Sequence, residues 1–183
     1  MNEEPKQKLL DIAHRSVEAA VSGRRLPKVT ETDPELTGKQ GAFVTLKTHG
    51  NLRGCIGRFI SEIPLCKLVA EMAQASATED SRFFGNQLQP SELPDLHIDI
   101  SVLSPLEKTD DPLSIELGVH GIYIKRGFAS GCFLPQVATE TGWSKEEFLG
   151  NCCSHKAGLA ADAWRDPETE VFTFTAEVIE DGS

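Results

Sequence analysis

The stretch GAFVTLKTHGNLRGCIG, residues 41–57, has the pattern of two strands joined by a tight turn, and the rest of the fold can be built outward from it. Ala42 to Thr48 is rich in apolar and β-branched residues, which favour a strand. His49-Gly50-Asn51 has the composition of a turn, and Leu52 to Ile56 is predicted to return as the second arm of a hairpin. An antiparallel hairpin is therefore the first expected element of a sheet.

Hydrophobic periodicity predicts helices and further strands on either side of this hairpin. Apolar residues at helical spacing predict helices over Pro5 to Val21 and Ser61 to Ala77, the second capped by Ser61 with Pro64 in its first turn. Residues 22–40 are predicted to form a surface loop. The next predicted elements are a half-buried strand from Leu96 to Leu103 and a hairpin made by Gly121–Lys125 and Gly131–Leu134, which turns near Gly127. A helix is predicted to begin at a Ser144–Glu147 capping box. One terminal strand is predicted from Val171 to Ile179, with Phe172, Phe174, Ala176 and Val178 on one face.

These elements predict an α+β fold with mainly antiparallel sheets and flanking helices. The chain has 183 residues, a length that suits one domain, and we expect residues 1–183 to form a single domain. The predicted sheet pieces allow a main body and a smaller lobe, although the sequence marks no boundary between them.

The composition narrows the classes of function. The formal net charge of −10 disfavours binding to the phosphates of nucleic acids. No apolar run approaches the ~20 residues of a membrane helix, and Met1 to Lys8 is polar, so we expect a cytoplasmic protein with no membrane partner. In a reducing cytoplasm the five cysteines are expected to be thiols.

The RGCIG segment, residues 53–57, is the strongest candidate for a functional site. Cys55 lies between Gly54 and Gly57, with Arg53 close in sequence. A guanidinium stabilises a thiolate, and glycine lets the backbone approach a ligand or turn its amides toward an oxyanion. The pattern suits a nucleophilic or anion-binding cysteine. It also suits a plain hairpin strand, because cysteine is often buried and glycine often marks a bulge.

The segment LRGCIG, residues 52–57, resembles the signature of the AMMECR-domain family, whose prokaryotic members are called AmmeMemoRadiSam system protein A. The similarity extends along nearly the whole chain. The further matching segments are, in order, Gly41–Leu46, Asp80-Ser81-Arg82-Phe83, Ile98–Leu103, Phe133–Ala138, Trp143, Phe148-Leu149, Lys156–Leu159 and Trp164. Ser81 departs from the family pattern, which usually has proline there, while Asp80 and Arg82 are kept.

This resemblance implies an unusual α+β arrangement with a cleft between two lobes. The prokaryotic family name implies a pathway shared with a Memo-like protein and a radical-SAM enzyme, which are therefore the expected partners, and it implies no particular reaction. The site residues that carry over directly are Arg53, Gly54, Cys55 and Gly57, and those that carry over as members of matching motifs are Asp80, Arg82, Gln136 and Lys156.

Position along the chain suggests how some of these residues act. Asp80 and Arg82 follow the helix after the signature, so they are expected either to fold back on the cysteine loop as an orienting ion pair or to form an ordinary salt bridge at a helix end. Gln136 follows Pro135 at a predicted strand-to-helix junction, where its amide could bind a polar substrate or satisfy nearby backbone groups.

A catalytic base, a metal site and a cofactor site are the remaining functional features to consider. His155 would serve as the base for Cys55 if the fold brings the two together, and otherwise it is a surface histidine. The cysteines and histidines lack the spacing of metal ligands, and the sequence contains no Gly-rich phosphate loop. The sequence therefore predicts no metal site and no cofactor.

Two functions stay open at this point. In the first, the protein is an enzyme or pathway component in which Cys55 acts as thiolate nucleophile or acid/base on a small anionic substrate. In the second, it is a binding or adaptor protein in which Cys55 only lines the cleft. A third function, association with nucleic acid, is disfavoured by the net charge of −10.

Overall fold

The computed structural model describes residues 1–182 and divides into two compact units, each with its own sheet. The first unit contains Met1–Leu103 together with the residues from Glu177 onward, and the second contains Ser104–Ala176. Each unit holds a four-stranded sheet with helices, which confirms the predicted α+β fold. The chain leaves the first unit after Leu103, forms the second unit, and returns to the first unit at Glu177.

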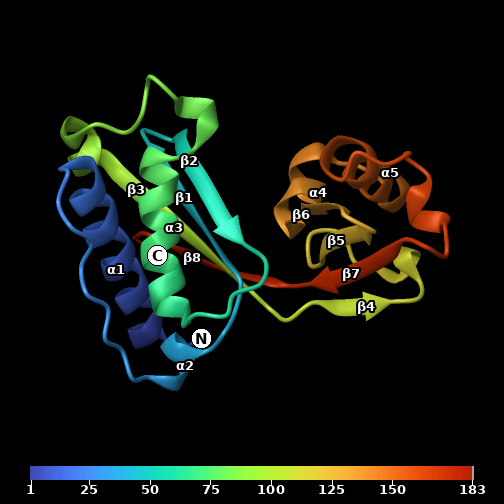
Figure 1. Ribbon diagram of the computed structural model, residues 1–183, viewed down its shortest axis with the longest axis horizontal. Coiled ribbons are helices and arrows are strands. Elements are labelled where there is room, and N and C mark those ends of the chain that lie inside the picture. Colours follow the sequence, from blue (N-terminus) through green and yellow to red (C-terminus); the bar gives the residue numbers. More distant parts are fainter. Residues whose placement is uncertain (183) are drawn as a thin grey trace. The chain divides into compact units, whose positions relative to one another are not determined.

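The first unit is a sheet of order β2-β1-β3-β8 with two long helices (Figure 1). The predicted hairpin and the strand over residues 96–103 are both present, and β1 pairs antiparallel with β2 and with β3. The elements of this unit are α1 (Glu3–Val21), α2 (Pro34–Thr37), β1 (Ala42–Thr48), β2 (Asn51–Arg58), α3 (Leu65–Thr78), the 3-10 helices η1 (Ser81–Phe83) and η2 (Pro90–Asp95), β3 (Leu96–Leu103) and β8 (Ala176–Glu180).

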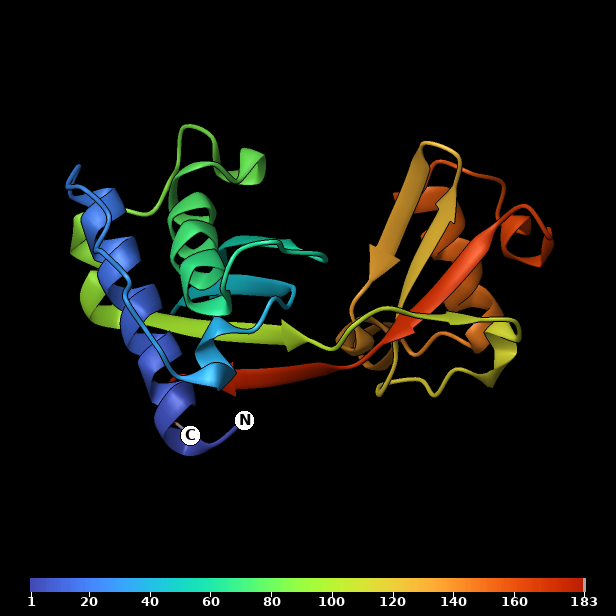
Figure 2. The same ribbon diagram turned by 60° about the horizontal axis from the view of Figure 1, so that its bottom comes forward.

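Helices α1 and α3 lie side by side against one face of this sheet (Figures 1 and 2). Alternate residues of β1 are buried under them, and Val44 and Leu46 pack into a core with apolar residues of both helices. Phe43, Thr45 and Lys47 alternate along β1 with these buried residues and project from the opposite side of the sheet. We call this side the far face.

The start of α3 differs from the prediction. Ser61 was expected to cap the helix, but the helix begins at Leu65, and the Ser61 hydroxyl instead accepts a hydrogen bond from the Ile63 N–H. The carbonyl of Pro64 accepts the first helical bonds, from Lys67 and Leu68. The cause is Pro64 itself, because a proline ring disfavours helical backbone in the residue before it and so stops the helix from extending back to Ser61.

The second unit is a sheet of order β4-β7-β5-β6 with short helices (Figure 2). The predicted hairpin and the helix with the Ser144–Glu147 capping box are both present. Its core joins Ile122, Ile124 and Val171 of the sheet to residues of the helices. The elements of this unit are β4 (Glu107–Thr109), η3 (Pro112–Ser114), β5 (Gly121–Arg126), β6 (Ala129–Phe133), α4 (Pro135–Thr141), α5 (Lys145–Asn151), the π-helical turn η4 (Cys152–Lys156), η5 (Ala163–Arg165) and β7 (Glu170–Phe174).

The single terminal strand predicted over residues 171–179 was wrong. The segment forms two strands, β7 in the second sheet and β8 in the first, and the chain changes sheet at Thr175. Thr175 is held there by Ser104, whose N–H donates to the Thr175 carbonyl and whose hydroxyl accepts from the Thr175 N–H. This change interrupts the alternation, so that Ile179 is buried while Val178, predicted to share a face with Phe174, is exposed.

Within residues 1–182, no helix combines the length and the apolar character that crossing a bilayer requires.

Strand β2 approaches helix α3 most closely at Gly54. A Cβ atom added to Gly54 would overlap the backbone carbonyl of Ser76, which belongs to the helix and cannot turn aside. The hydroxyl of Ser76 also bridges the two strands of the hairpin, since it accepts from the Ile56 N–H at 2.9 Å and donates to the Val44 carbonyl at 2.8 Å. The hairpin and the helix are thus joined by backbone contacts as well as by apolar packing.

We predict that Gly54→Ala destabilises the protein by about 1–3 kcal/mol, because strand and helix must move apart to admit the methyl group. Urea unfolding followed by circular dichroism measures this free energy. Gly38→Ala is the matched control, since a Cβ there would have its nearest neighbour, Gln40 Oε1, at an ordinary 3.6 Å. Equal unfolding midpoints for the two variants would contradict the close contact.

Candidate functional site

Cys55 lies in the middle of β2, which is an edge strand of the first sheet. It stands directly opposite Thr45 of β1, and its side chain projects from the far face with that of Thr45. The Thr45 hydroxyl donates a hydrogen bond to the Cys55 sulfur at 3.3 Å. Cys55 as a residue is partly exposed, and its sulfur is held by this neighbour.

The backbone of Cys55 is held by Asp80 and Arg82, which follow α3. The Cys55 N–H donates to Asp80 Oδ2 at 2.9 Å, and the Cys55 carbonyl accepts from the Arg82 guanidinium at 3.4 Å. Asp80 and Arg82 also form a bidentate ion pair, with Nε to Oδ1 at 2.9 Å and the terminal nitrogen to Oδ2 at 2.6 Å. The predicted folding back of this pair onto the cysteine segment is therefore present.

Asp80 is buried, with 5% of its side chain exposed, whereas Arg82 is 54% exposed. The hydrogen bonds from Arg82, with those from the backbone N–H groups of Cys55 and Arg82, lower the pKa of Asp80 from 3.8 to about 2, against the opposing effect of burial. The same pairing raises the pKa of Arg82. The carboxylate is therefore charged at neutral pH and fixes the position of Cys55.

Arg53 is the extra residue of a β-bulge in β2, because Gly54 pairs with Leu46 while Leu52 pairs with Lys47. Its guanidinium is bound by Glu92 through two hydrogen bonds of 2.8 and 3.0 Å, and only 11% of the side chain is exposed. Arg53 also donates to the carbonyl of Gln87 at 3.3 Å. Arg53, which was expected to stabilise a thiolate, is thus paired with Glu92, and it lowers the pKa of that carboxylate.

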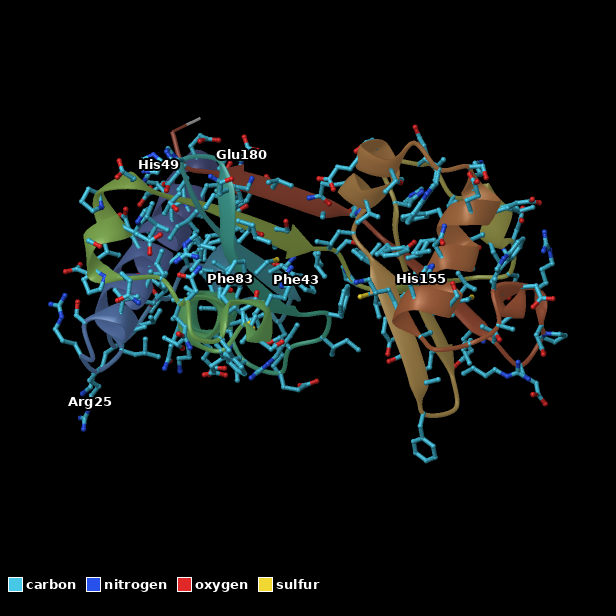
Figure 3. All side chains as sticks on the ribbon, turned by 90° about the horizontal axis from the view of Figure 1, so that it is seen from above. Arg25, Phe43, His49, Phe83, His155 and Glu180 are labelled. Carbon is cyan, nitrogen blue, oxygen red and sulfur yellow. The ribbon has the colours of Figure 1, made fainter. Side chains whose placement is uncertain are left out.

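The ring of Phe83, which is labelled in Figure 3, lies near the guanidinium groups of both Arg53 and Arg82. The carbon at the centre of the Arg53 guanidinium is 5.7 Å from the centre of its ring, and that of Arg82 is 5.8 Å from it. Both distances fall within the range of a cation–π contact. The ring therefore joins the two ion pairs on either side of the cysteine segment.

The two glycines of the signature have packing roles. Gly54 faces α3, as described above, and a Cβ atom at Gly57 would overlap the ring of Phe43, its cross-strand neighbour. The N–H of Cys55, which lies between them, already donates to Asp80. Close packing thus accounts for both glycines, whether or not they also contact a ligand.

Sequence reasoning missed three residues on the far face. Thr45 stands between Cys55 on one side and Asp99 of β3 on the other, so these three residues form a row across the sheet. Lys47, the next far-face residue of β1, makes an ion pair with Asp99 at 2.6 Å. The alternating pattern of β3 correctly placed Asp99 away from the core. Predicting that Cys55, Thr45 and Asp99 lie in one row would also require the register of the strands, which the sequence does not reveal.

Three further predicted residues belong to the second unit. Gln136 lies at the predicted junction between β6 and α4, and its buried Oε1 atom has no hydrogen-bond partner within residues 1–182. Lys156 has its ammonium 5.7 Å from the ring centre of Phe133, and His155 is exposed in the same π-helical turn (Figure 3). A role for His155 as the base for Cys55 stays a prediction.

The environments of the cysteines differ. Cys66, Cys152 and Cys153 are buried, whereas Cys55 and Cys132 are partly exposed. Burial raises the pKa of Cys66, Cys152 and Cys153, and it raises that of Cys132 to about 11, although Lys156 opposes this last shift. Within residues 1–182, no group of three His, Cys, Asp or Glu side chains is arranged to hold a metal ion.

The low pKa of Asp80 makes part of the stability depend on pH. Because the folded pKa of about 2 lies below the ordinary 3.8, this contribution is present above about pH 4 and is lost as the pH falls toward 2. We predict that Asp80→Asn lowers the free energy of unfolding at pH 7 by at most about 2 kcal/mol, since the exposed guanidinium is partly screened.

Urea unfolding at pH 7, 4 and 2.5 tests this prediction, because the difference between wild type and Asp80→Asn should shrink as the pH falls. Glu79→Gln removes an exposed carboxylate next to Asp80 and serves as the control. A difference that stays constant down to pH 2.5 would rule out the ion pair as its source.

Known proteins resemble this chain in both sequence and structure. The AMMECR1 family model matches residues 10–179. A protein of Methanothermobacter thermautotrophicus is 42% identical over 182 residues, covering 95% of this chain and 93% of its own, and one of Nanoarchaeum equitans is 42% identical over 180 residues, covering 94% and 98%. The crystal structure of an uncharacterised protein from Pyrococcus horikoshii has a TM-score of 0.88 and 36% identity, covering 100% of this chain and 94% of its own. The chain therefore belongs to the AMMECR1 family.

Proposed function

We propose that the first unit carries a thiol-dependent site in which Cys55 acts as a thiolate nucleophile or as an acid/base on a small substrate. The observation that carries this proposal is the setting of Cys55, a partly exposed residue whose sulfur accepts a hydrogen bond from Thr45 at 3.3 Å. A cysteine with only a packing role is usually buried, as Cys66 is in the same unit. In a reducing cytoplasm, the location we propose, such a thiol stays free to react.

In this proposal Asp80 and Arg82 position the cysteine. Hydrogen bonds to the N–H and the carbonyl of one residue fix its backbone, and a fixed backbone limits where the sulfur can lie. Positioning of this kind is a large part of what an enzyme contributes to catalysis. Because the Cys55 N–H is already engaged, an oxyanion would need donors other than this amide.

We further propose that the substrate is anionic. Support comes from Arg82, whose half-exposed guanidinium reaches the carbonyl of Cys55 at 3.4 Å. An exposed guanidinium can bind a carboxylate or phosphate with the donors that its existing partner leaves open. Gln136 and Lys156 remain proposed substrate-binding residues in the second unit, the first because its buried amide oxygen lacks a partner within residues 1–182.

A second function is favoured because packing and ion pairing account for the residues of the LRGCIG segment. Gly54 and Gly57 are explained by packing, and Arg53 by its ion pair with Glu92, so the segment needs no chemistry to account for it. In this alternative the protein binds a ligand or a partner, such as a Memo-like or radical-SAM protein, and Cys55 only lines the surface. The two proposals differ in the reactivity of the thiol.

Alkylation of the native protein by iodoacetamide, followed by mass spectrometry at each cysteine, separates them. We predict that Cys55 reacts faster than the buried Cys66, Cys152 and Cys153 by at least about tenfold, because reaction requires an accessible thiolate. The buried cysteines are controls within the same molecule. If Cys55 reacts only after unfolding, the catalytic proposal fails and the binding proposal is left.

The charge of the reagent tests the nature of the substrate. The measured quantity is the rate of alkylation by iodoacetate divided by the rate of alkylation by iodoacetamide. We predict that this ratio is about threefold higher for Cys55 than for the thiol of glutathione, because a nearby guanidinium attracts the anionic reagent. Arg82→Gln should remove this preference. Arg58→Gln is the matched control, since Arg58 of β2 is as exposed as Arg82 and is likewise paired with a carboxylate, that of Glu71 in α3. A ratio equal to that of glutathione would exclude an anion-binding site.

A further inference from the structure

Thr45 lies in an interior strand of the first sheet. It lies in β1, which is paired with β2 on one side and with β3 on the other. Its β-branched side chain has few allowed rotamers, so the hydroxyl keeps a defined direction. That hydroxyl donates to the Cys55 sulfur at 3.3 Å. Thr45 therefore presents a fixed hydrogen-bond donor to the thiol.

The charged groups around the thiol form pairs. They are Arg82 with Asp80 beside the backbone of Cys55, Arg53 with Glu92 at the bulge, and Lys47 with Asp99 on the far face. Each cation is matched by a carboxylate, and Arg82 also interacts with the Cys55 side chain, which helps to raise the pKa of Arg82. His97, opposite Lys47, is the other titratable group of β3 on this face. A thiolate at Cys55 would therefore be stabilised by the charge of Arg82 together with the direct hydrogen bond from Thr45.

We propose that Thr45 is a further positioning residue of the site, which donates a hydrogen bond from its hydroxyl to the Cys55 thiolate and holds the sulfur on the far face. This inference rests on the proposed function, because it assumes that the Cys55 thiolate is the reactive species. It extends that function by assigning a stabilising role to a neutral hydroxyl of the adjacent strand and not to Arg53. A hydrogen bond to a charged acceptor is about twice as strong as one between neutral groups.

The experiment compares Thr45→Val, which keeps the shape and loses the hydroxyl, with Thr45→Ser, which keeps the hydroxyl. The rate of Cys55 alkylation by iodoacetamide is measured from pH 6 to 9 on the full chain, with thermal unfolding recorded for each variant. We expect Thr45→Val to slow alkylation about tenfold at pH 7.5 and to move the pH profile to higher pH. Thr45→Ser should stay within about twofold of wild type. The slow reaction of Cys66, which is buried in the same unit as Thr45, should not become faster, and this separates loss of the hydrogen bond from general loosening of that unit.

The outcomes distinguish this inference from the function on which it rests. If Cys55 is reactive in the wild type and Thr45→Val has the same rate and pH profile, the inference is overturned while the thiol site stands. If Cys55 does not react in the native wild type, both are overturned. If Thr45→Val does not fold, Thr45→Ala replaces it, and a rate equal to that of Thr45→Ser overturns the inference.

Discussion

The hydrogen bonds between Asp80, Arg82 and the backbone of Cys55 are the interaction on which the site depends. An edge strand leaves alternate N–H and C=O groups without a neighbouring strand. At Cys55 a carboxylate takes the N–H and a guanidinium approaches the carbonyl, so the ion pair supplies the acceptor and donor that another strand would provide. This holds the segment in place at the edge and leaves the thiol free on the far face.

That interaction is possible because of how the hairpin meets α3. Gly54 lets the strand lie against the helix, and the Ser76 hydroxyl links the helix to both strands of the hairpin. Helix α3 ends at Thr78, so Asp80 emerges beside the middle of β2. On the other side of the segment, the bulge at Arg53 directs a second guanidinium to Glu92. Packing and ion pairing thus fix the same few residues from several directions.

These contacts also determine which groups could stabilise a thiolate at Cys55. The signature suggested that an arginine next to the cysteine would supply positive charge, but both arginines of the site are matched by carboxylates. The Cys55 sulfur accepts a hydrogen bond from the Thr45 hydroxyl of the adjacent strand. A reactive thiol in this setting would rely on fixed geometry, on this hydrogen bond and on the nearby Arg82 guanidinium, and its polar surroundings continue along the far face to the Asp99–Lys47 pair.

The sequence by itself determined the long helices and most strands, because the spacing of apolar residues records which side of each element is buried. It missed the short helix α2, which lies in the predicted loop over residues 22–40 and buries Leu36. It also indicated the Asp80–Arg82 pair, whose members lie two positions apart and close to the end of a helix. Only the tertiary structure decided that Arg53 meets Glu92, that Thr45 lies between Cys55 and Asp99, and that the terminal strand divides at Thr175 between two sheets. These features depend on strand register, on a bulge and on the path of the chain, which bring distant residues together and leave no local pattern in the sequence.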